Sequence, residues 1–292
     1  MNKLTTAKRA AIVRCLVKGN SIRATCRLTG AAKATVLKLL VELGEFCSIY
    51  QDHRLRNLSC QRVEADEIWA FFGAKARNAS RSGDGDIWTF TAIDPDSKLM
   101  LTWLVGGRTQ ENADCFIADV ADRVAGRIQL TTDGHGMYLT AVRRAFDIGE
   151  VAYAMLVKTY GTATAGEVSQ ARKYSPMVCT GAKRERMIGR PEMDLVSTSI
   201  VERANLSMRT QMRRFTRLTN GFSKKAENHA HAVSLFFMFY NFCRPHAALT
   251  TAHPRHYPTT PAMAAGLTDR VWSVEDVLGL MDPDHKVGES NG

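Results

Sequence analysis

Three carboxylates stand out in this sequence because of the residues around them. Asp66 lies in an alternating, aromatic-rich segment, Asp133 ends a short apolar segment, and Glu202 is the single acid among seven Lys or Arg residues between Val196 and Lys225. Carboxylates gathered at one site repel one another unless a cation lies between them. Hard oxygen ligands favour Mg²⁺ or Mn²⁺, and two such ions, about 4 Å apart, can activate a water or a 3′-hydroxyl and stabilise the leaving oxygen of a phosphodiester. The three residues therefore predict metal-dependent phosphodiester chemistry, provided that the fold brings them together.

Each acid also has a structural explanation. Asp66 has acidic neighbours at positions 64 and 67, and acids at strand ends are often solvated. Asp133 precedes a glycine, and Asp-Gly is an ordinary turn pair. Ser199 and Glu202 have the spacing of a capping box, which would satisfy the first amides of a helix. For each acid taken singly, the structural explanation is favoured over a catalytic role. Their common placement on one predicted sheet favours the catalytic role, without settling it.

The segments that must position these acids predict a mixed α/β domain. Alternating patterns predict three strands, at 62–73, 86–94 and 98–107, and the last two are joined by a turn at 94–97. A helix capped by Thr109, a buried strand ending at Asp133, a helix over 139–147, a strand over 151–158 and a long helix from about Ser199 follow. This order is that of a ribonuclease H-like sheet, in which the first and fourth strands are neighbours. Asp66 and Asp133 are then expected to face each other, with Glu202 on a helix beside them.

The helix that begins near Ser199 has two predicted stripes. The buried stripe consists of Val201, Ala204, Met208, Met212 and Phe215. Beside it lies a polar stripe of Glu202, Asn205, Arg209 and Arg213. A carboxylate followed by an amide and two guanidinium groups suits a metal ligand with phosphate contacts beyond it. We expect DNA to contact Asn205, Arg209, Arg213, Arg214, Lys224 and Lys225.

The positive charge of the chain is concentrated near its N-terminus. The net charge is +10, and residues 1–57 hold eleven Lys or Arg against three Asp or Glu. Three helices are predicted within residues 6–45, and a Gly30 turn joins the second and third, which matches a helix-turn-helix. A plain three-helix bundle with solvated lysines is the alternative, but the localised charge favours binding to phosphates. Lys33, Thr35 and Lys38 are the expected DNA contacts, and residues 46–60 are expected to form a linker.

The remaining composition is that of an ordinary soluble protein. Seven scattered cysteines form no CxxC pair, which fits a reducing cytosol. The N-terminus has no apolar signal core, and the longest apolar run, residues 235–240, is too short to span a bilayer. Cys243-x-x-His246 and His253-x-x-His256 have zinc-like spacing, but isolated Cys/His pairs are weak signals. We expect a cytoplasmic protein that does not enter a membrane.

These segments resemble the DDE transposases of the insertion sequence one family. The matching stretches are EADEIWAFFGAKAR, TTDGHGMY, VERANLSMRTQMRRFTRL and GFSKKAENHAHAV, and the resemblance is best over about residues 60–245. It implies that Asp66, Asp133 and Glu202 are the catalytic acids and the ligands of two Mg²⁺ or Mn²⁺ ions. It also implies binding to the terminal inverted repeats of an insertion sequence, nicking that exposes 3′-hydroxyls, and their joining to target DNA. We expect a homodimer or larger homo-oligomer on double-stranded DNA.

The expected organisation has three parts. Residues 1–57 form the helix-turn-helix domain with its linker, residues 58–250 the ribonuclease H-like catalytic domain, and residues 251–292 a C-terminal tail. The Pro-rich stretch 249–267 is expected to be irregular. More residues separate Asp133 from Glu202 than separate the corresponding acids in the best-known member of the family. We therefore expect residues 159–196 to form an insert of unknown role. That member has a cysteine-based zinc finger before its helix-turn-helix, and no such finger is visible in this sequence. A non-catalytic DNA-binding regulator and a nuclease that cuts without joining are the alternative functions.

Overall fold

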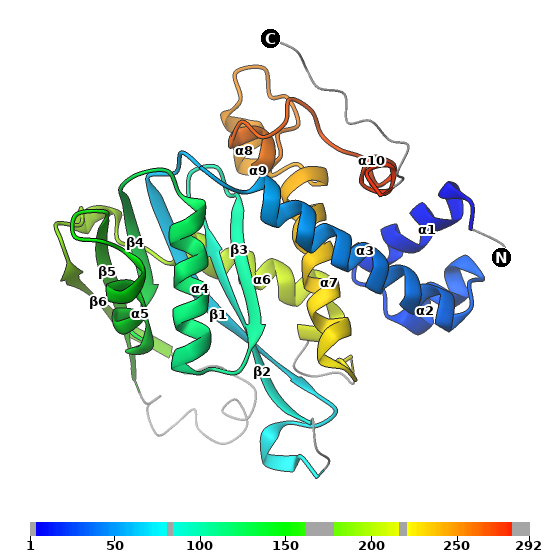
Figure 1. The fold of residues 1–292 in the computed structure, drawn as a ribbon, viewed down its shortest axis with the longest axis horizontal. Helices are drawn as coiled ribbons and strands as arrows, with labels where there is room; N and C mark the ends of the chain where they lie inside the picture. The colour runs from blue at the N-terminus through cyan, green and yellow to red at the C-terminus, as the bar shows by residue number, and fades with distance from the viewer. Residues whose placement is uncertain (1–3, 81–83, 162–177, 216–220, 282–292) are drawn as a thin grey trace.

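A six-stranded mixed sheet forms the centre of the molecule. The computed structural model describes residues 4–80, 84–161, 178–215 and 221–281. The strand order is β3-β2-β1-β4-β5-β6 (Figure 1). The strands are β1 (Arg62–Phe72), β2 (Gly85–Ile93), β3 (Met100–Gly106), β4 (Ile128–Asp133), β5 (Val151–Gly161) and β6 (Val178–Ile188).

The pairing agrees with the predicted topology over the first five strands. β1 runs antiparallel to β2, and β2 antiparallel to β3, whereas β4 lies parallel to both β1 and β5. The expected adjacency of the first and fourth strands is therefore confirmed. The segment 159–196 differs from the prediction, because residues 178–188 form β6, which pairs antiparallel with β5. Part of the expected insert, 162–177, lies outside the described residues.

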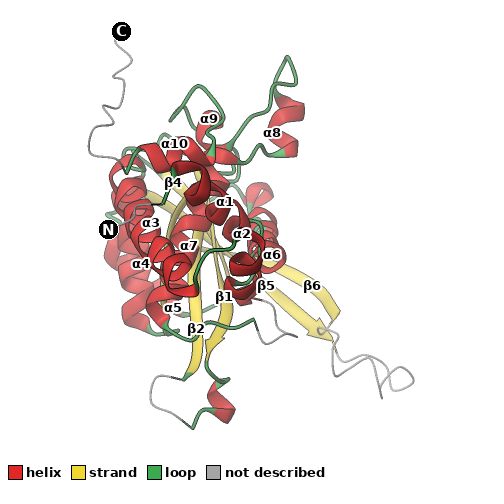
Figure 2. Cartoon of the chain, turned by 90° about the vertical axis from the view of Figure 1, so that its right-hand side faces the viewer, coloured by secondary structure: helices red, strands yellow, loops and turns green. Residues whose placement is uncertain are grey.

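Helices cover the two faces of the sheet. The helices α4 (Gln110–Arg123) and α5 (Met137–Ala145) lie on one face, and α6 (Ser199–Gln211) lies on the other (Figures 1 and 2). The alternation along β1 follows these layers, because successive strand side chains point to opposite faces. Val63 and Ala65 belong to the apolar cluster that includes α4 and α5, and Ile68 and Ala70 to the cluster that includes α6.

The N-terminal helices begin where the sequence predicts, but the third is longer. They are α1 (Thr6–Val17), α2 (Ile22–Thr29) and α3 (Lys33–Arg54). Ser21 Oγ accepts from the Ala24 amide at the start of α2, and Gly30 ends it with a φ of 66°. The predicted linker at 46–60 is wrong for residues 46–54, because they continue α3. This half of α3 is amphipathic, with Cys47 and Gln51 buried, and it packs against α7 (Ala226–Met238).

The last part of the chain is more ordered than predicted. The stretch expected to be irregular, 249–267, contains α9 (Pro261–Ala264) and most of α8 (Ala247–Ala252). A third short helix, α10 (Val274–Gly279), follows in the tail. A capping box of Ser273 and Asp276 starts α10. α10 packs against α1, and the exposed Arg14–Glu275 ion pair joins them. The apolar core is continuous across residue 57, so α1, α3, the sheet and α10 share one cluster.

A buried amide completes the outer edge of β3. Asn241 lies in a π-helical turn (Phe239–Cys243) that follows α7. Its Nδ2 donates to the Met100 carbonyl at 3.0 Å, and its Oδ1 accepts from the Met100 amide at 3.0 Å. Nδ2 also donates to Gln51 Oε1 of α3 at 3.3 Å. Asn241 is fully buried, so its side chain takes the place of a neighbouring strand at this position.

We expect Asn241→Leu to lower the free energy of unfolding by about 3 kcal/mol, because each buried polar group left without a partner costs about 1–3 kcal/mol. Urea denaturation followed by circular dichroism measures this change. Asn78→Leu is the control, since Asn78 is exposed and such substitutions usually change stability by less than about 0.5 kcal/mol. Equal stabilities of the two variants would contradict the edge-completing role of Asn241.

Candidate active site

The predicted Asp66 and Asp133 are brought together where β4 ends. The last parallel pair between β1 and β4 is Ala65 with Thr132, so the two aspartates follow at the next position of both strands. Beyond Asp133 the chain leaves the sheet towards α5, whereas β1 continues to Phe72. β4 therefore ends beside a strand that continues, and both carboxylates lie at this end.

A third carboxylate, Glu67, belongs to the same group. One ligand oxygen from each of Asp66, Glu67 and Asp133 lies within 4.8 Å of the others. Desolvation raises the pKa of Asp66 to about 6 and that of Glu67 to about 7, and in both cases the neighbouring charge of Asp133 adds to the shift. Three hard oxygen donors that repel one another match the donor set that Mg²⁺ and Mn²⁺ prefer. The residues present therefore fit a divalent metal ion.

Asp66 is held in place by α6. Asn205 Nδ2 donates to Asp66 Oδ2 at 2.9 Å, while Asn205 Oδ1 accepts from the Thr91 hydroxyl of β2 at 3.2 Å. Asn205 is only 2% exposed. Its side chain orients a carboxylate, and this burial does not favour the predicted contact of Asn205 with DNA.

Glu202 lies on the same helix but outside the group of three acids. Its Oε1 accepts from the Thr198 hydroxyl and forms an ion pair with Lys158 of β5. Its charge nevertheless contributes, as the smallest of the causes, to the raised pKa of Asp66. The structure thus brings two of the three predicted acids together and places Glu202 nearby, with its carboxylate held by a lysine.

The capping box of Ser199 and Glu202, which is the structural alternative for Glu202, does not form at the start of α6. Thr198 is the N-cap residue, so Ser199 is already the first helical residue, and no side chain at the N-cap satisfies the helix amides. The cap comes from β1, because Glu64 Oε2 accepts from the amides of Ile200 and Val201 at 2.8 and 2.9 Å. Glu202 therefore has no part in capping the helix on which it lies.

The predicted apolar residues are buried as expected, but Met212 and Phe215 lie beyond the end of α6, and the polar stripe is likewise shorter than predicted. All five expected apolar residues are buried in one cluster: Val201, Ala204, Met208, Met212 and Phe215. α6 ends at Gln211, and Arg213 lies in a short 3-10 turn (Arg213–Phe215). Arg213 is thus exposed but not in line with Glu202 and Asn205.

The other predicted DNA contacts differ in exposure. Arg214 points inward, where Nη1 donates to Ser223 Oγ at 2.8 Å and burial lowers its pKa to about 10. Arg209 is half-buried on α6, and Lys224 and Lys225 are exposed just before α7. At the start of α3, Lys33 and Lys38 are exposed and Thr35 is half-buried, and Lys38 lies 3.6 Å from Glu42.

Glu67 is not among the predicted site residues. Period-2 alternation places it on the face opposite Asp66, towards α5. There its Oε2 lies 3.3 Å from Arg108 Nη2. Tyr138 of α5 is buried beside Glu67. Burial raises the pKa of the Tyr138 hydroxyl well above its usual range, and the negative charge of Glu67 adds to the shift. A search for nearby acids on one face of β1 cannot find this residue.

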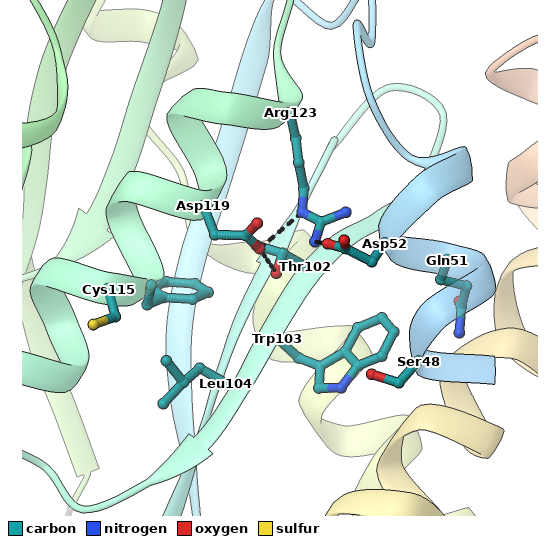
Figure 3. Close-up of a pocket in the computed structure, with 10 residues that line it drawn as sticks. Ser48, Gln51, Asp52, Thr102, Trp103, Leu104, Cys115, Asp119 and Arg123 are labelled. Carbon is teal, nitrogen blue, oxygen red and sulfur yellow. Dashed lines mark hydrogen bonds and ion pairs between the residues drawn. The ribbon is translucent and has the colours of Figure 1, made fainter. Parts of the chain in front are cut away.

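A cavity of about 280 Å³ lies elsewhere, between α3, β3 and α4, and contains none of the predicted site residues (Figure 3). Beside it Arg123, 6% exposed, donates to Asp119 at 2.8 Å and to Asp52 at 2.7 Å. Arg123 also donates to the Leu55 carbonyl at 3.1 Å. These bonds join the end of α3 to α4.

The structure also bears on the predicted absence of a membrane span and on the Cys/His pairs. Within the described ranges, no helix is long and apolar enough to cross a membrane. Cys243 is buried beneath the C-terminal segment, whereas His256 is exposed. In the part of the chain that the structure describes, the acidic group at Asp66 is the single cluster of three potential metal ligands.

Comparisons with known proteins give similarities in structure but none in sequence. No protein-family model matches the chain, and no curated protein matches it in sequence. Among solved structures, the chain is similar to a piggyBac transposase in a synaptic complex with hairpin DNA, at 11% identity and a TM-score of 0.43. The alignment covers 96% of this chain and 73% of that one.

Proposed function

We propose that this chain is a DNA transposase that binds the terminal inverted repeats of an insertion sequence and catalyses metal-dependent strand cleavage and strand transfer. The supporting observation is the meeting of Asp66 and Asp133 at the end of β4, beside a helix that bears Glu202. The resemblance of the surrounding segments to DDE transposases of the insertion sequence one family supplies the reaction class.

In this proposal Asp66, Asp133 and Glu202 are the catalytic acids and hold Mg²⁺ or Mn²⁺, with two ions at the site. Bound ions of this kind would activate the attacking hydroxyl and stabilise the leaving oxygen of a phosphodiester. Asn205 keeps the Asp66 carboxylate directed into the site through its 2.9 Å bond. Lys158 is the partner of Glu202, so it also lies where a negatively charged strand would approach.

The proposed DNA-binding surface includes the start of α3 and the basic residues that follow α6. The exposed cations among the expected contacts are Lys33, Lys38, Arg213, Lys224 and Lys225. Because such contacts are made to phosphates, they release counterions and make binding depend on salt. The proposal includes a homodimer or larger homo-oligomer that acts on double-stranded DNA in the cytoplasm.

The affinity of the full-length protein for a 40-base-pair duplex should fall steeply with salt concentration. Lys33→Ala combined with Lys38→Ala should reduce the slope of log affinity against log salt by about 2, since each phosphate contact contributes about 0.9. Fluorescence anisotropy at several salt concentrations measures these slopes. Arg127→Ala is the control, because Arg127 is exposed at the turn before β4. An unchanged slope in the double variant would remove the start of α3 from the DNA-binding surface.

A strand-transfer assay tests the whole proposal. Labelled DNA from the ends of the element that encodes the chain is incubated with the full-length protein and a target plasmid, with Mg²⁺, Mn²⁺ or EDTA. We expect metal-dependent nicks that expose 3′-hydroxyls, followed by joined products. Cleavage without joining would indicate a nuclease, and binding without either reaction would indicate a regulator of DNA.

A further inference from the structure

We propose that Glu67 is a metal ligand of this site and reaches the ion from the face of the sheet opposite Asp66 and Glu202. This inference deepens the proposed function, on which it rests for the presence of a divalent ion. It adds a protein ligand to the three that the sequence predicts.

Glu67 can approach Asp66 and Asp133 from the opposite face of the sheet because β4 ends at Asp133. In a continuous sheet, the backbone of a neighbouring strand would separate the side chains of consecutive residues such as Asp66 and Glu67. The pairing of β1 with β4 stops at Ala65, one position before Asp66. Past that point β1 has no β4 neighbour, and oxygens of Asp66, Glu67 and Asp133 come within 4.8 Å of one another.

The environment of Glu67 supports ligation. Its side chain is 1% exposed, and Arg108 contacts one oxygen, Oε2, at 3.3 Å. The other oxygen, Oε1, is buried and accepts no hydrogen bond of normal length, although the Tyr138 hydroxyl lies near enough to Glu67 to lower the pKa of its carboxyl. A buried carboxylate oxygen without a partner is costly, and its cost increases beside two further carboxylates. A divalent cation would satisfy the oxygen and offset the repulsion.

A structural ion pair with Arg108 does not account for this arrangement. Arg108 satisfies one of the two oxygens and also lies over the ring of Trp88, at 4.6 Å from its centroid. A side chain present only to bind Arg108 would have no reason to approach Asp133. Glu202, in comparison, is 41% exposed in its side chain and has both Thr198 and Lys158 as partners.

The test measures binding of Mn²⁺ to the full-length protein without DNA, by calorimetry and by electron paramagnetic resonance of the unbound ion. We expect Glu67→Gln to weaken Mn²⁺ binding at least about tenfold, in the range that even outer-shell changes at metal sites produce. Glu67→Asp keeps the charge but shortens the side chain, so it should also weaken binding. Glu185→Gln, on the exposed strand β6, should bind Mn²⁺ as the parent does.

Thermal melting with and without Mn²⁺ shows whether each variant is folded and gives a second readout. The rise in melting temperature that Mn²⁺ causes in the parent should shrink in both Glu67 variants. Parent-like affinity in both variants, with binding lost in Asp133→Asn, would overturn the role of Glu67 and leave the proposed function intact. Absence of saturable Mn²⁺ binding in the parent would overturn this inference together with the metal dependence of the proposed function.

Discussion

Asp66→Asn and Asp133→Asn should each reduce DNA cleavage and joining by about three orders of magnitude while leaving the protein folded and able to bind DNA. Metal ions stabilise the charge of such a transition state by several kcal/mol, and about 4 kcal/mol corresponds to a thousandfold in rate. Asparagine has nearly the same shape as aspartate but lacks the charge that a divalent cation requires. Cleavage of labelled element ends, followed on denaturing gels in Mg²⁺ and in Mn²⁺, measures the loss.

The fold should tolerate these substitutions because the charges repel one another. The raised pKa of Asp66 means that the metal-free protein destabilises the ionised carboxylate, so removal of its charge relieves a cost. The Asn205–Thr91 contact remains available in both variants. Asp122→Asn, on the exposed face of α4, is the matched control and should retain full activity. If either site variant kept near-normal strand transfer, its aspartate would lose the catalytic assignment.

Glu64→Ala should mainly lower stability, whereas Glu202→Gln should mainly lower activity. Glu64 is 5% exposed, and its carboxylate accepts from two amides at the start of α6. Its loss leaves both amides without that partner, so the free energy of unfolding should fall by about 2–4 kcal/mol. The charge-retaining variant Glu64→Asp should fall between the parent and Glu64→Ala.

Glu202→Gln should instead unfold within about 1 kcal/mol of the parent, because Glu202 is partly exposed and does not cap α6. Its strand-transfer rate should nevertheless fall by about two orders of magnitude or more, since an amide is a poor substitute for a carboxylate ligand. Chemical denaturation and the strand-transfer assay give the two values for each variant. A Glu202→Gln protein with normal activity would show that the charge of Glu202 is needed neither for a metal ion nor for the ion pair with Lys158, and Glu202 would lose its catalytic assignment.

The local patterns of the sequence predicted the elements that bring Asp66 and Asp133 together. Alternation identified the strands, and their order was sufficient to predict that β1 and β4 are neighbours. The buried stripe of α6 followed from its 3.6-residue period, which depends on neighbouring residues alone. Each of these features is determined by interactions that are short in sequence or repeated along an element.

The features that the sequence did not predict depend on distant contacts. The cap of α6 comes from Glu64, 136 residues before Ile200, whereas a capping box is recognised within four residues. Glu67 joins the site because β4 ends early, and no pattern within β1 indicates this. The continuation of α3 past residue 45 and the strand β6 are stabilised by packing on α7 and pairing with β5.

α3 has a mechanical consequence if its first turn binds DNA. This helix has 22 residues, which corresponds to a length of about 33 Å at 1.5 Å per residue. Its middle packs so closely on α7 that a Cβ at Gly44 would lie 2.5 Å from His231, and its end is bonded to α4 through Asp52 and Arg123. A helix anchored at its middle and end acts as a ruler. The length of this helix would then fix the number of base pairs between the recognised sequence and the phosphodiester that is cut. A DNA-binding domain joined by a flexible linker would allow that number to vary.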